Sequence, residues 1–215
     1  MEIKQIVESI KQAKTDSPKR NFKQKIDFVI NLKDLDLKKN ENHVDFFAQL
    51  HHSVGKKIKV CALGGLELSE EGKKVCDNFV LQEEFKSFDK VKAKKLANGY
   101  DFFIAQANLM GQIAGAFGKV FGPRGKMPNP KAGCVVPPKA ALGPLYEKLQ
   151  TTVRISAKKD PVIHLLVGNE DMKEEEVADN IKTIYEQLIH HLPGEINNIK
   201  SGFVKLTMGK PVKLF

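Results

Sequence analysis

The chain has 215 residues and a formal net charge of +9, because 35 lysines and arginines outnumber 26 acids. A chain of this length buries roughly 70% of its unfolded surface, so its stability requires neither a metal nor a disulfide. A prior of about 150 residues per domain predicts one or two domains. The charge favours an anionic partner such as nucleic acid, and the alternative is a basic soluble protein with no such partner.

Three widely spaced cysteines without a CxxC pair argue against a zinc site and a disulfide framework, and they fit a reducing cytoplasm. The N-terminus lacks the apolar run of a signal peptide. The longest uncharged stretch, residues 102–118, is shorter than the ~20 apolar residues that a membrane span needs. We therefore expect no membrane partner and no metal.

The first quarter of the chain predicts one helix and one strand. An amphipathic helix from Ile3 is expected to end before Pro18, and apolar residues alternate with polar ones over 26–32, as in a strand with one buried face. Residues 34–55 are polar and charged, with a turn expected at 37–42. His51 and His52 lie within this stretch, and a solvated pair is favoured there over metal ligands, because no further ligands are found.

From residue 58 the pattern changes to short apolar strands that alternate with helices. Strands are predicted at 58–65, 79–81 and 100–106, and helices at 68–76, 83–97, 108–117 and 138–150. Alternating strands and helices with short connections predict a parallel or mostly parallel open sheet.

The last third of the chain again shows strands of alternating polarity and an amphipathic helix, as the first quarter does. Strands at 153–156 and 162–167 flank KKDP, which is typical of a hairpin-like turn, and a helix over 172–191 opens with acids that suit the positive end of its dipole. Residues 201–215 are extended and contain a Thr-Met-Gly turn. We expect these late strands to pair with 26–32.

The predicted fold class therefore combines α/β and α+β domains. A split α+β domain is expected from 1–57 plus 153–215, with a Rossmann-like three-layer α/β domain of residues 58–152 inserted in it. The two chain crossings, near Lys57 and Val153, are expected to form a double hinge that permits opening and closing.

One stretch, 118–136 (GKVFGPRGKMPNPKAGCVV), is rich in glycine, proline and cations, which describes a shaped basic loop. No acid lies between Asp101 and Glu147, so the loop suits a polyanion. It is not a Walker phosphate loop, since Val120 and Met127 replace the first glycine and the hydroxyl residue. Neither a G-x-G-x-x-G spacing nor a G-x-S-x-G elbow occurs, and we expect no enzymatic activity and no cofactor.

The segment GPRGKMPNPKAG, at 122–133, resembles the signature of the ribosomal protein L1 family. Similar stretches are Asn21-Phe22, FFIAQANLM at 102–110, VGNE at 167–170, ADNI at 178–181 and KLTMG at 205–209. The combination of FFIAQA with GPRGKMPNP looks most like the archaeal branch.

The resemblance implies a non-enzymatic constituent of the large ribosomal subunit in the cytoplasm, monomeric when free. Its partners would be large-subunit rRNA, with which it forms the mobile lateral stalk, the exit-site tRNA whose release it assists, and its own mRNA, which it represses. The alternative is a nucleotide-dependent enzyme that uses the α/β insert.

The resemblance also implies that the outer domain carries the main RNA contact. The expected RNA-binding residues are Arg20, Asn21, Phe22, Lys25, Gly168, Asn169, Ser201, Thr207, Met208 and Gly209. Spacing alone favours a core position for Phe22, whereas the resemblance favours an RNA contact. Lys25 stands where the family usually has a small hydroxyl residue.

The chemistry of the Thr-Met-Gly turn suits RNA, because a hydroxyl can reach a ribose, Met208 offers an apolar surface, and a glycine permits close approach. Arg124 and Lys126 lie in the signature loop, which either contacts RNA or shapes the insert near an interdomain cleft.

Overall fold

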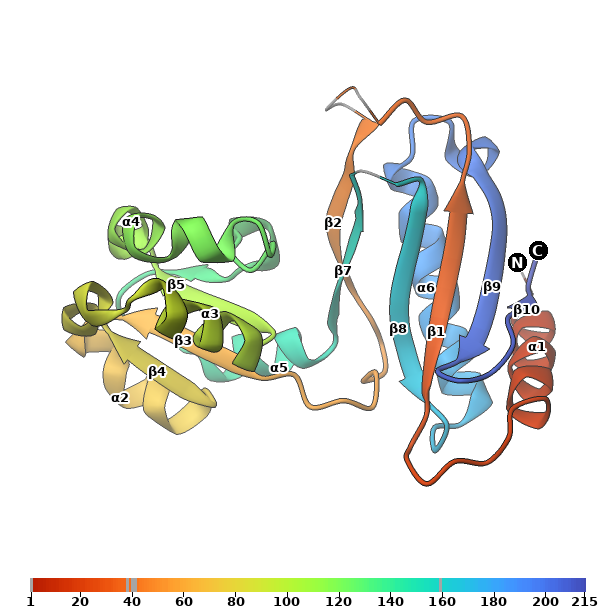
Figure 1. The fold of residues 1–215 in the computed structure, drawn as a ribbon, viewed down its shortest axis with the longest axis horizontal. Coiled ribbons are helices and arrows are strands. Elements are labelled where there is room, and N and C mark those ends of the chain that lie inside the picture. The colour runs from red at the N-terminus through yellow and green to blue at the C-terminus, as the bar shows by residue number, and fades with distance from the viewer. Residues whose placement is uncertain (1, 38, 40–41, 159) are drawn as a thin grey trace. The chain divides into compact units, whose positions relative to one another are not determined.

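The computed structural model describes residues 2–37, 39, 42–158 and 160–215. The chain separates into two compact units: Met1–Lys56 with Thr151–Phe215, here called the terminal unit, and Lys57–Gln150, here called the insert. Parallel and antiparallel sheets occur together with helices (Figure 1), which confirms the predicted fold class. The expected boundaries lie close to the limits of the two units, and the double hinge stays a prediction.

The terminal unit is built on an antiparallel sheet with the strand order β10-β9-β1-β8. Its strands are β1 (Lys25–Leu32), β8 (Val162–Asn169), β9 (Ile199–Leu206) and β10 (Val212–Lys213). Two helices, α1 (Ile3–Thr15) and α6 (Glu174–His191), pack with it, and α6 lies behind the sheet in Figure 1. A short 3₁₀ helix, η5 (Glu195–Asn198), precedes β9. The late strands therefore pair with the first strand, as predicted.

Burial alternates along β1, since Ile26, Phe28 and Ile30 are fully buried in the core while the residues between them are half-buried. An alternation of this kind means that one face of the sheet carries the core and the other does not. The half-buried residues of β1 lie on the face of the sheet opposite the core.

A second, two-stranded sheet joins β2 (Val44–Gln49) to β7 (Thr152–Ala157). The hairpin predicted around KKDP is wrong, because β7 pairs with β2 while β8 pairs with β1. The strand β2 was missed among charged neighbours, although Val44, Phe46 and Ala48 alternate in it as a buried face. Residues 38, 40, 41 and 159, which belong to the two turns predicted at 37–42 and at KKDP, lie outside the described residues.

The insert holds parallel strands in the order β4-β3-β5-β6, which confirms the predicted parallel sheet. Its elements are β3 (Val60–Gly64), α2 (Leu66–Val75), β4 (Asn78–Leu81), η2 (Gln82–Ser87), α3 (Lys90–Gly99), β5 (Phe102–Gln106), η3 (Ala107–Leu109), α4 (Met110–Phe121), η4 (Pro130–Ala132), β6 (Val135–Val136) and α5 (Gly143–Gln150). Helices α3 and α4 cover one face of the sheet and α2 and α5 the other, so the insert has three layers (Figure 1).

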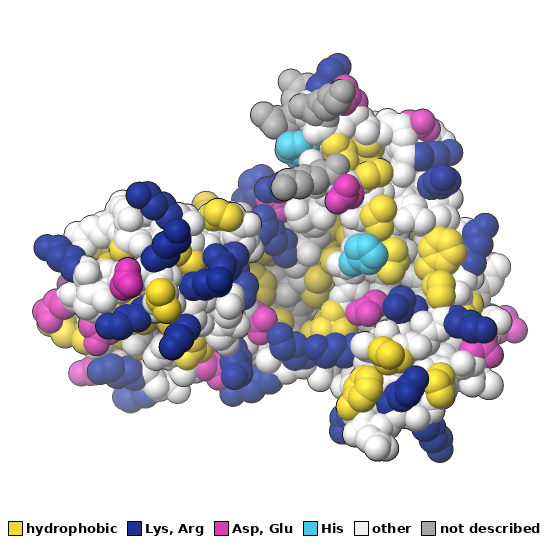
Figure 2. All heavy atoms as spheres, in the orientation of Figure 1, with side chains coloured by type: hydrophobic (Ala, Val, Ile, Leu, Met, Phe, Trp, Pro, Cys, Tyr) yellow, Lys and Arg dark blue, Asp and Glu magenta, His cyan; other side chains and the backbone are white. Residues whose placement is uncertain are grey.

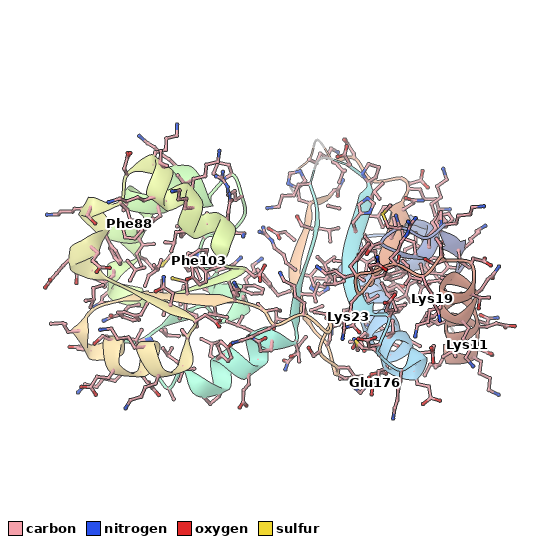
Figure 3. All side chains as sticks on the ribbon, turned by 60° about the horizontal axis from the view of Figure 1, so that its bottom comes forward. Lys11, Lys19, Lys23, Phe88, Phe103 and Glu176 are labelled. Carbon is pink, nitrogen blue, oxygen red and sulfur yellow. The ribbon has the colours of Figure 1, made fainter. Side chains whose placement is uncertain are left out.

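The core of the insert lies between the sheet and the α3–α4 layer. Phe103 of β5, labelled in Figure 3, packs against Phe121 with ring centroids 4.3 Å apart, and Phe121 stacks on Phe117 at 5.1 Å. The helix predicted over 83–97 is divided into η2 and α3, because Asp89 accepts a hydrogen bond from the N–H of Lys90 and starts a new helix there. Within the described part of the chain, no helix combines the length and apolar character needed to span a membrane.

Candidate nucleic-acid interface

The predicted RNA-binding residues that follow β9 meet the start of β1 at one end of the terminal sheet. The N–H of Thr207 donates to the carbonyl of Lys25 at 3.0 Å, and the N–H of Lys25 donates to the hydroxyl of Thr207, also at 3.0 Å. The Thr207 hydroxyl therefore acts as a further acceptor of the β-ladder. Its first role is to close the turn, and the expected contact with a ribose is secondary to it.

Two large apolar side chains are exposed beside this turn. Phe22 is 50% exposed and Met208 is 56% exposed. Core placement of Phe22, which spacing alone favoured, is wrong. The aromatic ring lies on the segment before β1 and the thioether on the turn after β9, so both are offered to solvent at the same end of the sheet.

Gln24 joins the segment of Phe22 to the turn of Met208, and the sequence did not indicate it. Its side chain is only 2% exposed. Its Oε1 accepts from the N–H of Met208 at 3.2 Å, while its Nε2 donates to the Ser17 hydroxyl at 3.2 Å and to the Pro18 carbonyl at 3.3 Å. A buried amide with these partners fixes both loops in one arrangement.

Gly209 completes the turn. Its N–H donates to the carbonyl of Leu206 at 3.0 Å, and a Cβ at this position would lie 3.2 Å from the Leu206 Cβ and 3.4 Å from the Ser17 Cβ. A glycine suits this position, because the turn packs closely against β9 and the segment after α1 and a Cβ would make tight contacts there. The glycine thus supports the position of Met208.

Cations surround this end of the sheet, and some are already paired. Arg20, Asn21 and Lys25 are exposed. Lys23 forms an ion pair with Asp171 at 2.6 Å, and this hydrogen bond raises the pKa of Lys23. Figure 3 labels Lys11 on α1, and Lys19 and Lys23 on the segment that follows.

A hollow of about 360 Å³ lies under the segment after α1. It is lined by Lys14, Ser17, Lys19, Arg20, Gln24, Glu170, Asp171 and Leu206. Lys14 donates to Glu174 at 2.6 Å, and this hydrogen bond lowers the pKa of Glu174. Exposed cations beside an apolar surface are the two elements that single-stranded or looped RNA requires.

Gly168 and Asn169, predicted from the VGNE motif, have structural roles. A Cβ on buried Gly168 would lie 2.8 Å from the Val177 Cγ2, so this glycine lets α6 pack against β8. Asn169, which pairs with Lys25 across the strands, donates its amide to the carbonyl of Gly55 at 3.2 Å. It therefore fixes the loop at Gly55, where φ is +72°.

Ser201 lies on β9 at the opposite end from Thr207, about 20 Å away at ~3.3 Å per residue. Its hydroxyl accepts from the Asn31 amide at 3.0 Å, and its side chain is nearly buried. The structure does not bring Ser201 into the turn. It places Ser201 instead on the uncovered face of the sheet.

That uncovered face, here called the open face, is defined by the strand register. It comprises Lys205, Asp27 and Leu166 in one row, Phe203, Val29 and His164 in the next, and Ser201, Asn31 and Val162 in the third. Most of these side chains are half-buried, and His164 is exposed. An aromatic ring and a histidine flank the same valine, so the open face has the composition of a surface on which bases stack.

Asp27 is the acid of the open face. Burial raises its pKa, and the opposing effects of Lys205, Lys25 and His164 only partly offset this. A carboxylate at this position repels the phosphates of a polyanion, and the neighbouring cations partly offset that repulsion. Figure 2 shows a histidine, acids and cations together with apolar side chains on the face of the terminal unit that is turned to the viewer.

Two of the four cations of the signature loop, Arg124 and Lys126, bond within the insert. Lys126 donates to the carbonyls of Ala97 and Tyr100, both at 2.6 Å, where α3 ends, and Arg124 donates to the carbonyl of Val120 at 3.0 Å. Gly125 and Gly133 adopt φ of +65° and +74°. These contacts favour the loop as a shaped part of the insert, with Arg124 exposed at its tip.

The cysteine of this loop is not a reactive thiol. Cys134 is buried, and burial raises the pKa of its thiol to about 11. Its cationic neighbours in sequence do not lower it, since Lys126 is directed toward α3. A thiol with a raised pKa is a poor nucleophile near neutral pH.

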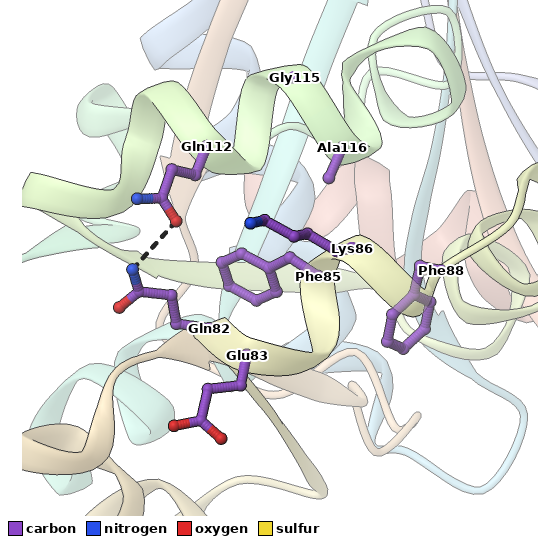
Figure 4. A pocket seen from close by; sticks show the side chains of 8 residues that line it. All are labelled: Gln82, Glu83, Phe85, Lys86, Phe88, Gln112, Gly115 and Ala116. Carbon is purple, nitrogen blue, oxygen red and sulfur yellow. Dashed lines mark hydrogen bonds between the residues drawn. The ribbon is translucent and has the colours of Figure 1, made fainter.

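A hollow of about 1000 Å³ in the insert lies between η2 and α4 (Figure 4). Phe85 and Phe88 line it, and the Gln82 amide donates to Gln112 at 3.0 Å across one end. Its polar groups include both Glu83 and Lys86. It belongs to the insert, whereas the interface described above belongs to the terminal unit.

A smaller hollow of about 360 Å³ lies where the parallel strands end, the usual nucleotide-binding place of an open α/β sheet. Here the N–H of Gly65, at the start of α2, is already bonded to the Oε1 of Gln106 at 2.7 Å. Glu67 and Glu83 line the same hollow. The geometry and charge of this place therefore disfavour a nucleotide phosphate.

The two adjacent histidines are less free than predicted. His51 Nδ1 lies 2.7 Å from the carboxylate of Asp179, and His52 Nε2 lies 3.7 Å from it. Buried Asn180 donates to the carbonyl of His52 and accepts from its N–H, both at 3.2 Å, so the ADNI motif clamps this loop onto α6. No group of three metal-ligating side chains occurs among the residues that the structure describes.

Comparison with known proteins adds to this geometry. Residues 10–210 match the profile of the Ribosomal protein L1p/L10e family. The chain is 39% identical over 213 residues to "Large ribosomal subunit protein uL1" of Methanobrevibacter smithii, covering 98% of each chain. It is 41% identical to the protein of that name from Pyrococcus abyssi, over 97% of this chain and 94% of the relative. The Nanoarchaeum equitans relative is 38% identical, over 97% and 98%.

Proposed function

Because the chain belongs to the Ribosomal protein L1p/L10e family and is a large-subunit ribosomal protein, we propose that its terminal unit binds large-subunit rRNA directly. In this proposal the protein forms the mobile lateral stalk near the exit site of the cytoplasmic ribosome. It acts as a structural and RNA-binding component and not as an enzyme. The strand-end hollow of the insert, with its occupied N–H and its carboxylates, gives the nucleotide-enzyme alternative no support.

One observation carries the proposal. Phe22 and Met208 are both exposed, and the buried amide of Gln24 ties together the two segments that present them at one end of the sheet. Exposing two large apolar groups costs solvation free energy, and ordering their loops costs conformational entropy. Both costs are offset when a base or ribose packs against the pair, as unstacked bases of RNA loops do.

The open face extends this surface along the sheet. Phe203 and His164 lie on either side of Val29, and Lys205 lies one row nearer to the turn. An RNA strand that contacts Met208 can continue over these rows, where flat rings stack on bases and lysine meets phosphate. Ser201 is then an RNA contact at the distal end of the open face and not part of the turn.

The test is the affinity of the full chain for a folded stalk-rRNA fragment, compared with an unrelated hairpin across a range of salt. We expect Met208→Ala to weaken stalk binding by about 1–3 kcal/mol, the usual scale of a specific contact. Thr207→Ala should do the same, because it opens the turn. Preference for the stalk is expected to persist near physiological salt, where non-specific binding weakens.

Ile196→Ala provides the matched control. Ile196 is 58% exposed, as Met208 is, but it lies on η5 at the other end of β9. Its removal should leave stalk affinity unchanged. Equal affinity of the native chain for the stalk fragment and the hairpin would refute the proposal, and so would a loss in Ile196→Ala as large as in Met208→Ala.

The finer roles of the family follow from the same surface. We propose that the protein assists release of deacylated tRNA from the exit site, and that it represses its own mRNA when the message presents a fold like the stalk. Repression then depends on the same side chains as rRNA binding. A reporter that carries the native leader should be repressed by the wild-type chain and released by Met208→Ala, while Ile196→Ala still represses it.

A further inference from the structure

Helix α3 of the insert has a basic, solvent-exposed face that contributes nothing to the packing of the core. Its ten residues include four lysines and no acid (Lys90, Lys92, Lys94, Lys95), and all four are exposed. Ala93 and Ala97 are the buried residues of α3, so the lysines lie on the solvent side. None of the four forms an ion pair with another residue that the structure describes.

This arrangement is electrostatically unfavourable in the free protein. Lys90 and Lys94 are four residues apart and Lys92 and Lys95 are three apart, spacings at which like charges repel on a helix. Lys90 and Lys92 also lie in the first turn, where the helix dipole favours acids, and the last turn contains no cation. A merely solvated helix face usually mixes both signs, as α2 does with Glu70, Glu71, Lys73 and Lys74.

The asymmetry extends to the whole layer. Residues 82–134, which form η2, α3, α4 and the signature loop, contain nine lysines and arginines against four acids, whereas residues 65–77 and 137–150 of the opposite layer contain four against five. Asp89 caps α3 and Asp101 accepts from the N–H of Lys59, so two of the four acids have structural partners. Figure 2 shows lysine and arginine side chains gathered over this layer of the insert.

The signature loop joins the same surface. Lys126 binds the carbonyls of Ala97 and Tyr100 at the end of α3 and so holds the loop against that helix. The loop tip then carries exposed Arg124. A loop made rigid by glycine and proline would hold Arg124 in a fixed position relative to the lysines of α3.

We propose that α3 and the Arg124 tip form a second RNA-binding surface, which binds the phosphate backbone of double-helical RNA without reading its sequence. Charge complementarity names the occupant, since several unpaired cations along one rigid helix match a linear row of phosphates. Val91 is the one large apolar side chain exposed on α3, and α3 has no aromatic residue on which a base could stack. The surface is distinct from the proposed rRNA site of the terminal unit and needs no part of it.

The experiment uses the full chain and a mixed-sequence RNA duplex as the probe. The triple variant Lys92→Gln, Lys94→Gln and Lys95→Gln is compared with Lys73→Gln, Lys74→Gln and Lys139→Gln, which removes the same charge from the opposite layer. We expect the α3 variant to lose at least about tenfold in duplex affinity at low salt, and its salt slope to fall by about 2–3. The control variant should change both much less.

Two further measurements keep the result unambiguous. The α3 variant should unfold at an unchanged or higher temperature, since it removes repulsion, so a loss of binding does not report misfolding. It should also retain the preference for the stalk fragment over a hairpin, which separates this surface from the proposed function. Equal losses in the two triple variants would overturn the inference. So would an equal loss of binding to polyglutamate and to the duplex, because the surface would then select any polyanion.

Discussion

Replacement of Gln24 by methionine tests whether the turn is held in place for RNA. The change preserves the size of a side chain that is 2% exposed but removes its hydrogen bonds to Ser17, Pro18 and the N–H of Met208. At about 0.5–1.5 kcal/mol each, their loss lowers the free energy of unfolding by about 2–4 kcal/mol. The freed turn must then be ordered again on binding, at about 1–2 kcal/mol per residue.

Gln24→Met is therefore expected to weaken stalk binding by about 5- to 150-fold, which corresponds to about 1–3 kcal/mol. Stability is measured by denaturant unfolding, and affinity by titration of the stalk-rRNA fragment well below the unfolding midpoint. Leu188→Ala is the matched control, because Leu188 is fully buried in α6 and its truncation costs about 2–5 kcal/mol of stability without touching the turn.

Gln24→Glu refines the test. Its carboxylate still accepts from the N–H of Met208 but can no longer donate to Pro18, so affinity should fall between the native and methionine variants. The reasoning is refuted if Gln24→Met and Leu188→Ala both bind the stalk fragment with the affinity of the native chain. The buried amide would then serve stability alone.

Four other changes are predicted from the same contacts. Asp27→Asn should strengthen RNA binding and raise the stability of the protein at neutral pH. Burial raises the pKa of Asp27, so this carboxyl favours the folded state most below its ordinary pKa of 3.8, and the benefit is lost as pH rises through the folded pKa. A series of melting curves against pH would reveal this dependence. Gly55→Ala should lower the free energy of unfolding by about 1–2 kcal/mol in denaturant titrations, because φ is +72° and the new Cβ would clash with the amide of Asn169. Lys126→Met should destabilise the insert by about 1–3 kcal/mol and leave stalk affinity unchanged, since its donors serve α3. Cys134 should react with a thiol reagent only on unfolding, because burial raises its pKa to about 11.

Periodicity predicted the parallel sheet of the insert and the pairing of the late strands with β1, because those strands have unmixed apolar patterns. It failed for β2, where Asp45 interrupts the apolar residues. In the fold that carboxylate receives a bidentate contact from Arg154 of β7, at 2.9 and 3.0 Å, and this partner lies more than a hundred residues away. A single sequence contains no sign of such a pairing.

The candidate site was predicted in part. Exposure of Phe22 and Met208 agrees with the roles that the family resemblance gave them, although spacing alone had placed Phe22 in the core. Gln24 was missed because a glutamine between two lysines in an exposed segment has the pattern of a surface residue. Only the fold shows that its side chain points inward and accepts from the N–H of Met208, 184 residues away in the sequence.

The division of labour within the turn explains why residues of such different chemistry are needed together. Thr207, Gly209 and Gln24 use their polar groups or their small size inside the protein, so they have little left to offer RNA directly. Their effect is to hold Met208 in one place, on a turn bonded to the segment that carries Phe22. A surface that is already ordered loses little entropy on binding, and this contributes to affinity as much as the contacts with RNA do. Substitutions that leave both apolar side chains intact but loosen the turn should therefore weaken binding nearly as much as removal of Met208 itself.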